Sequence, residues 1–162
     1  MRARRAARGA AAGAAAATLW ALQQPLDKRV FGSRYDDVEL LGKLVTRGPG
    51  WRVTGLALHA ANGAAFGAAF AMTRPHVPGS PLAQGVTAAM AEHFGLWPLG
   101  RLADRSHPAR RELEPLTGNR RALAQATWRH LVFGVALGTL EPRLNGGSVP
   151  SAQRPATTGR HS

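Results

Sequence analysis

The apolar residues of this chain gather in four stretches rich in Ala and Gly, and polar, charged segments separate these stretches. Each stretch is close to the length that an α-helix needs to cross about 30 Å of hydrocarbon at about 1.5 Å per residue. The pattern predicts an all-α, four-helix transmembrane bundle that forms a single domain over residues 1–144, with spans at about 6–25, 52–73, 80–100 and 121–141.

The segment between the first two spans has the pattern of a short amphipathic helix, over residues 34–47. Ser33 and Asp36 stand at the spacing of a capping box, and Gly48-Pro49 stops the helix. Its apolar residues recur on one face, which we expect to lie on the membrane surface or against the bundle.

The remaining connections differ in length and composition. Residues 73–80 form a short Pro/Gly turn, which predicts an antiparallel hairpin of the second and third spans. Residues 101–121 are charged, and we expect a helical portion around residues 110–113. The tail, residues 145–162, is rich in Gly, Ser, Pro, Thr and Arg, and its composition predicts disorder.

The second and fourth spans contain the same spaced motif, a His followed at four-residue intervals by two Gly. Residues at this spacing lie on one helix face, and two Gly there let another backbone approach closely. The repeat predicts a duplicated two-helix hairpin, although Gly-rich composition alone is the alternative explanation. The residues concerned are His59, Gly63 and Gly67 in the second span, and His130, Gly134 and Gly138 in the fourth.

Three of the four spans carry ionisable residues at a similar depth, roughly 10–12 Å from the end where the first and third spans finish. These residues are His59, Glu92, His93, Arg129 and His130. Ionisable groups are costly in hydrocarbon, so they usually face the interior of a bundle and pair with one another. We therefore expect a polar layer inside the bundle, with an ion pair between Glu92 and Arg129.

This polar layer has two interpretations. It is a structural latch that fixes the register of the helices, or it is a ligand, proton-relay or metal site, including the site of a membrane-embedded enzyme. Imidazole and carboxylate groups suit zinc or another transition metal, but the chain has no HExxH or comparable short signature. It also lacks a phosphate loop, a dinucleotide fingerprint and a Ser/His/Asp order. We therefore predict no catalytic residues, no enzyme activity, no bound metal and no cofactor.

Composition bears on the class of protein and on its partners. The 162 residues include 44% hydrophobic residues and no Cys, which excludes disulfide scaffolds and thiol chemistry. The net charge of +12 invites a nucleic-acid interpretation, a soluble basic helical protein. However, Arg far outnumbers Lys, as in the coding bias of a GC-rich bacterial genome, and the Arg residues form no stripe along one helix. We do not expect nucleic acid as a partner.

The tryptophans Trp20, Trp51, Trp97 and Trp128 all fall towards one end of the predicted spans, as in an interfacial aromatic belt. The predicted location is the bacterial cytoplasmic (inner) membrane, with several spans and an orientation that the basic residues leave open. The expected partner is the lipid bilayer, with a second copy of the chain or another membrane protein as alternatives. The predicted function is a structural, accessory or transport-related one.

The overall layout resembles a group of small bacterial integral membrane proteins. It combines a basic start, an Ala-rich helix, "WALQQPLDKR" (20–29), "SRYDDVELLG" (33–42) and three small-residue-rich helices that carry His. Over residues 6–144 this layout is similar to the YagU-like inner-membrane family. The resemblance implies an inner-membrane location and a helical architecture, and it implies no activity or site.

Overall fold

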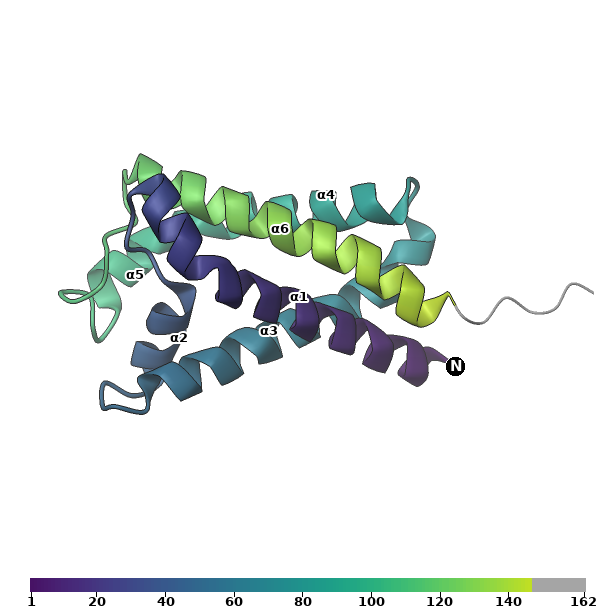
Figure 1. The fold of residues 1–162 in the computed structure, drawn as a ribbon, viewed down its shortest axis with the longest axis horizontal. Coiled ribbons are helices and arrows are strands. Elements are labelled where there is room, and N and C mark those ends of the chain that lie inside the picture. Colours follow the sequence, from purple (N-terminus) through teal and green to yellow (C-terminus); the bar gives the residue numbers. More distant parts are fainter. Residues whose placement is uncertain (147–162) are drawn as a thin grey trace, which may run out of the picture.

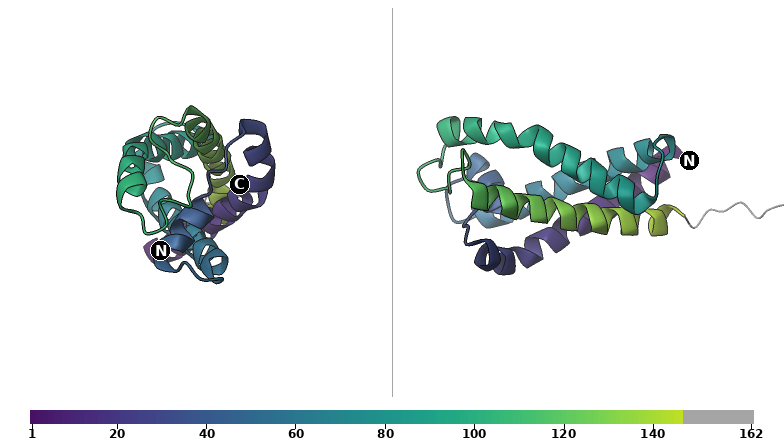
Figure 2. Two further views of the ribbon diagram at one scale, coloured as in Figure 1. Left: turned by 90° about the vertical axis from the view of Figure 1, so that its left-hand side faces the viewer. Right: turned by 90° about the horizontal axis from the view of Figure 1, so that it is seen from above.

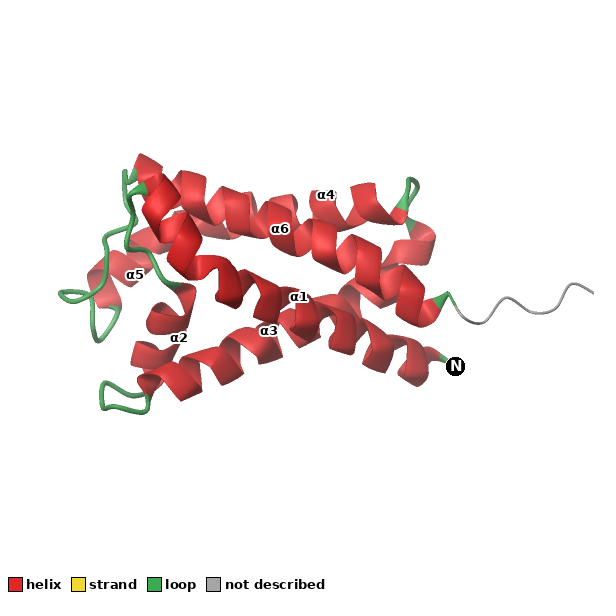
Figure 3. Cartoon of the chain, in the orientation of Figure 1, coloured by secondary structure: helices red, strands yellow, loops and turns green. Residues whose placement is uncertain are grey.

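The computed structural model describes residues 1–146, which form helices joined by loops and contain no strand (Figures 1 and 3). The prediction of an all-α fold is confirmed. The predicted disordered tail lies outside the described residues from residue 147 onward. The four long helices are α1 (Arg2–Phe31), α3 (Trp51–Thr73), α4 (Pro81–Leu96) and α6 (Arg120–Asn145), and the short ones are α2 (Asp37–Val45), η1 (Arg74–His76), η2 (Trp97–Leu99) and α5 (Gly100–Ser106).

The long helices pack as two pairs, α1 with α3 and α4 with α6, and α1 also packs along α6. The spatial order is therefore α3, α1, α6, α4, with little direct contact between the two outer helices. Figure 1 shows α1 and α3 crossing and then separating towards the end of the molecule that carries α2 and α5. The N-terminus and the α3–α4 turn lie at the opposite end, and Figure 2 gives the same arrangement from two other sides.

Glycines form the crossing point of α1 and α3. A Cβ atom at Gly63 would lie 2.7 Å from the carbonyl oxygen of Gly13, and a Cβ at Gly13 would lie 2.9 Å from the Cα of Gly67. Backbones this close leave no room for a side chain, which is the small-residue packing common between membrane helices.

The α4–α6 pair has the same construction. A Cβ at Gly85 would lie 2.6 Å from the carbonyl oxygen of Gly134, and a Cβ at Gly138 would lie 2.7 Å from the carbonyl oxygen of Pro81. In both pairs the predicted packing glycines therefore lie at the helix contact, each four and eight residues beyond a His.

The first helix is longer than predicted at both ends, and the expectation that it closes at Pro25 is wrong. Pro25 lies inside α1, which continues to Phe31 and stops at Gly32, a left-handed residue with φ 58°. The cost of the missing Pro25 N–H is offset by contacts of the added turns, because Asp27 becomes fully buried against α6. Gly32 suits the left-handed position because it has no Cβ.

The third predicted span is shorter than expected, because Trp97-Pro98 breaks the helix into the turn η2 and the separate helix α5. The charged segment that follows is helical at α5 and not at residues 110–113, which form turns. Polar contacts hold this loop. The Asp104 carboxylate accepts hydrogen bonds from two backbone N–H groups, those of Leu116 and Thr117, at 2.9 and 2.7 Å.

The amphipathic helix, α2, is shorter than predicted and has a different cap. Asp36 is the N-cap residue, and its carboxylate accepts the N–H of Glu39 at 2.9 Å. Ser33 instead donates to Glu114 in the α5–α6 loop at 3.3 Å. The predicted pairing of Ser33 with Asp36 as a capping box is therefore wrong. The helix begins at Asp37, three residues later than predicted, so Ser33 lies in the loop that follows α1.

The interior of the bundle is built from small and polar side chains. Most buried apolar residues are Ala, and the largest fully buried side chains are Arg129, Leu137, Gln125, Glu141 and Asp27. Within residues 1–146, one helical stretch, Trp51–His76, has the length and the mean hydropathy (1.2) of a membrane span, and a single such helix also occurs in soluble cores. The other long helices carry Arg and Gln, or, like α4 with 16 residues, are short.

Candidate functional site

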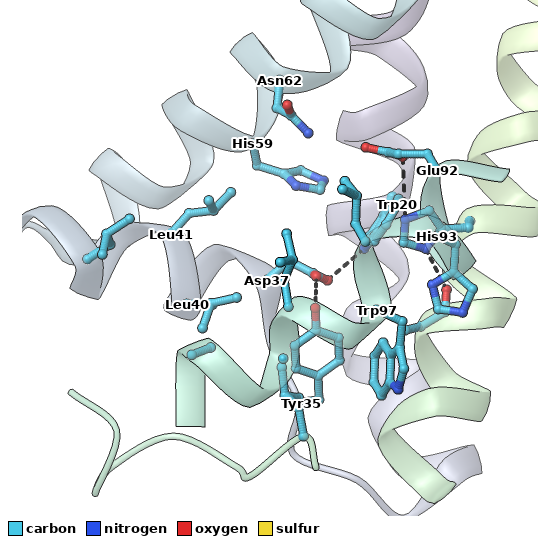
Figure 4. Close-up of a pocket in the computed structure, with 18 of the residues that line it drawn as sticks. Trp20, Tyr35, Asp37, Leu40, Leu41, His59, Asn62, Glu92, His93 and Trp97 are labelled. Atoms are coloured by element: carbon cyan, nitrogen blue, oxygen red, sulfur yellow. Dashed lines mark hydrogen bonds and ion pairs between the residues drawn. The ribbon is translucent and has the colours of Figure 1, made fainter. Parts of the chain in front are cut away.

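A chamber of about 620 Å³ lies between the diverging ends of α3 and α4. All six helices contribute to its walls, and α2 and α5 close it at one end (Figure 4). Its volume is in the range of small-molecule sites in proteins, and its walls are mostly apolar. The chamber exists because α1 and α3 separate beyond their glycine crossing.

Four of the five residues of the predicted polar layer line this chamber. His59 reaches it from α3, Glu92 and His93 from α4, and His130 from α6. Figure 4 shows His59 on one wall with Glu92 and His93 on the wall across from it. The fifth residue, Arg129, is fully buried and faces away from the chamber, towards α1 and α2.

Arg129 pairs with two carboxylates, and neither belongs to Glu92. Its Nε and Nη2 atoms donate to both oxygens of Asp27 at 2.7 Å, and its Nη1 atom donates to Asp37 at 2.8 Å. The predicted Glu92–Arg129 pair is therefore wrong. Successive residues of a helix project about 100° apart, so Arg129 faces α1 while its neighbour His130 faces α4.

Asp37 joins the buried ion pairs to the chamber wall. It accepts hydrogen bonds from the indole N–H of Trp20 at 3.2 Å and from the hydroxyl of Tyr35. Burial alone would raise the pKa of Asp37, but the Arg129 guanidinium and the Tyr35 hydroxyl outweigh it and hold the pKa below 3.8. Burial and the Asp37 carboxylate raise the pKa of Tyr35 well above 10.0, so Tyr35 remains a neutral donor.

The histidines meet around Trp20. The centroid of the Trp20 ring lies 5.1 Å from that of His59 and 4.5 Å from that of His130, both edge to face. His93 lies 4.5 Å from His130, ring to ring, and Glu92 lies 3.6 Å from His130 Nε2. The predicted layer thus forms a chain of contacts from α3 through α1 to α6 and α4.

The geometry does not support the metal interpretation of this layer. Among residues 1–146, no three His, Asp or Glu side chains lie close enough together to hold a metal ion. Trp20 separates His59 from His130, so the imidazoles cannot converge on one point.

The aromatic belt predicted from the four tryptophans is incomplete. Trp20 is buried in the core, and its indole N–H bonds to Asp37. Trp128 is exposed on α6 and donates to Gln23 at 2.9 Å, as an interfacial residue can do. The position of a residue along a helix does not determine which face of the helix it occupies.

Sequence reasoning missed Asp27, Asp37 and Trp20 as members of the buried network. Asp37 stands in the first turn of α2, an ordinary position for an acid, and Asp27 lies just beyond the predicted first span. The available signal was the charge balance, because a buried Arg needs a carboxylate, and these two acids flank the same end of the bundle.

No known protein family, no curated protein and no solved structure matches this chain. The resemblance to the YagU-like family therefore stays an expectation from the sequence pattern, and the function must be inferred from the molecule itself.

Proposed function

We propose that this protein is a multi-pass membrane protein of the bacterial cytoplasmic membrane, in which α1, α3, α4 and α6 each cross the bilayer. Its role is non-catalytic, as a structural, accessory or transport-related component. The observation that carries the proposal is the distribution of polarity, which is the reverse of that in a soluble bundle.

Large apolar side chains lie mainly on the outside of the bundle, and the few buried charged side chains among residues 1–146 are Asp27, Asp37, Arg129 and Glu141. A soluble protein of this size buries most of its Leu and Val, whereas here many of them are exposed. The fully buried side chains instead include the paired Arg129 and Asp27, which are 0% and 1% exposed. The exposed apolar residues include Leu19, Leu22, Leu26, Val53, Leu56, Leu58, Leu82, Phe94, Leu96, Leu131 and Val135.

Charged side chains are confined to the two ends of the bundle. In the four segments 9–26, 53–73, 77–99 and 122–140, the charged residues are Glu92, which faces the chamber, and the buried Arg129. Each segment is long enough to cross most or all of about 30 Å of hydrocarbon. The Arg residues outside these segments suit lipid headgroups at both surfaces, which accounts for the net charge of +12 without nucleic acid.

The matched glycine contacts support the idea of a duplicated hairpin. Gly13 meets Gly63 in one pair, Gly85 meets Gly134 in the other, and a His lies one turn before the second glycine in each. Two copies of a two-span hairpin insert in the same orientation, so the copies would be related by a pseudo-two-fold axis along the membrane normal.

The polar groups of the site are arranged for binding more than for catalysis. Asp27 and Asp37 are both ion-paired with Arg129, so neither is a free general base. Thr127 lies 2.9 Å from His93, but its hydroxyl already donates to the Leu123 carbonyl at 2.8 Å and is not activated as a nucleophile.

Fractionation combined with one substitution tests the proposal. We expect the protein to stay in the membrane pellet after alkaline washing and to be released by detergent. Ala61→Arg places a charge on the exposed face of α3 near the middle of the proposed span and should abolish insertion, since Arg at mid-membrane costs about 2.5–3.5 kcal/mol or more. Val45→Arg, an exposed position on α2, is the matched control and should have little effect. Wild-type protein in the supernatant without detergent would contradict the proposal.

A further inference from the structure

The chamber is acidic although the protein is strongly basic. Asp37 and Glu92 are the carboxylates that line it, and no Lys or Arg lines it among residues 1–146. Arg129 is shared by Asp27 and Asp37, so this triad keeps one net negative charge. Glu92 has no Lys or Arg partner within residues 1–146 and adds a second negative charge when it is ionised, in a chain whose net charge is +12.

The hydrogen-bond partners of the histidines assign their tautomers. His59 Nε2 meets the Ala17 carbonyl at 3.1 Å, and His130 Nδ1 meets the Ala126 carbonyl at 2.8 Å. A carbonyl only accepts, so these nitrogens carry the protons. In a neutral imidazole the other nitrogen is then a bare acceptor, which makes His59 Nδ1 and His130 Nε2 acceptors.

This assignment leaves two acceptors facing each other. His130 Nε2 lies 3.6 Å from a carboxylate oxygen of Glu92, and neither atom brings a proton when His130 is neutral and Glu92 is ionised. A donor placed between them removes the repulsion, and a donor that is positively charged also satisfies the carboxylate. The pair could therefore accept hydrogen bonds from a positively charged N–H group and form one side of a binding site for it.

The remaining walls suit the apolar part of such a molecule. Trp20 and Trp97 line the chamber near Glu92 and His93, and aromatic faces attract cations. Leu40, Leu41 and Leu44 of α2 line its other end. Figure 4 shows Leu40 and Leu41 well separated from Glu92, so that a molecule with one polar end would span the chamber.

We propose that the chamber binds an amphipathic amine, whose ammonium donates to the Glu92 carboxylate and to His130 Nε2, and whose apolar body lies among the leucines of α2. This proposal goes beyond the proposed membrane role. It depends on the geometry of the chamber and not on how many helices cross the membrane. Charge and hydrogen-bond donation both set the selectivity, so a neutral analogue of the same shape binds weakly.

A fluorescence titration of the purified, detergent-solubilised full chain tests this proposal. The probe is monodansylcadaverine, an aliphatic primary amine that carries an aromatic dansyl group, and the reference is its N-acetylated form, which lacks the ammonium charge. We expect the amine to bind at least about tenfold more tightly than the reference, since one hydrogen bond to a charged group contributes about that factor or more. Equal affinity of the two forms, or no saturable binding of the amine, would overturn the proposal.

Glu92→Gln is the decisive variant, because it removes the charge and keeps the shape. We expect it to weaken amine binding about ten- to hundredfold and to leave the N-acetylated form unchanged. Glu39→Gln on α2 is the matched control, since both side chains are 25% exposed and Glu39 pairs with Lys43 outside the chamber. Loss of affinity in both variants, or in neither, would contradict the assignment.

A second pair of variants tests the proposal even if Glu92→Gln disturbs folding. Leu44 lines the chamber and Val45 does not, and both are exposed on α2. Leu44→Arg places a positive charge at the chamber wall and should weaken amine binding, whereas Val45→Arg should not. Equal effects would contradict the location. A protein that needs no detergent would refute the membrane proposal and leave the affinity ratio of amine to reference unaffected.

Discussion

Replacing Arg129 by Leu should destabilise the protein severely, because Arg129 pairs with two buried carboxylates. It makes two hydrogen bonds to Asp27 and one to Asp37, and it donates to the Tyr35 carbonyl at 3.1 Å. Its side chain is 0% exposed, and that of Asp27 is 1% exposed. Removing one partner of a buried ion pair costs about 3–5 kcal/mol, because the other charge is left without compensation.

For a chain of 162 residues this loss corresponds to a fall of about 6–20 °C in Tm. Circular dichroism during heating of the detergent-solubilised protein measures it. The triple variant Arg129→Leu with Asp27→Asn and Asp37→Asn removes all three charges together, so it should recover most of the stability. A shift below about 1 kcal/mol for Arg129→Leu, or a triple variant no more stable than the single one, would refute the reasoning.

Three further predictions follow from other parts of the structure. Gly134→Ala should lower Tm by forcing α4 and α6 apart, whereas Gly95→Ala on α4, where a Cβ meets nothing within 4 Å, should raise stability by up to about 1 kcal/mol. Trp20→Phe should cost about 1–3 kcal/mol in thermal unfolding, because Asp37 loses a buried donor. Burial opposes ionisation of Asp104, but hydrogen bonds from the Thr117 side chain and two backbone N–H groups lower its pKa below 3.8. Its stabilisation is therefore complete above that value and is lost as pH falls through the folded pKa, and Asp104→Asn should remove this acid-dependent step from Tm measured against pH.

The helical architecture could be predicted from the sequence because small-residue spacing and helix breakers are local signals. The start of α3 and the turn after it follow from composition, and the glycines at the helix contacts follow from their spacing of four. The polar layer was found in the same way, since ionisable residues stand out in apolar stretches. Local signals also explain the errors, because Pro25 breaks an isolated helix and here lies within a longer one.

The partners within the site could not be predicted, because they depend on which face of each helix meets which neighbour. Arg129 and His130 are adjacent in sequence and face different helices, so depth alone paired Arg129 with the wrong acid. The chamber itself arises from the divergence of α1 and α3 and from α2, which fills part of that gap. Such long-range geometry has no short motif in the chain.

The central claim is that the four long helices span the membrane around a polar interior. Labelling of introduced cysteines tests this claim most directly, and it is practicable because the chain has no native Cys. Single variants Pro78→Cys and Gly48→Cys lie in turns at opposite ends, and Ala61→Cys and Val135→Cys lie on the exposed middle of α3 and α6. With a membrane-impermeant maleimide, we expect the two turn variants to label from opposite sides of the membrane and the two helix variants to label only after denaturation. Labelling of Ala61→Cys and Val135→Cys in the native protein as fast as the turns would contradict the account.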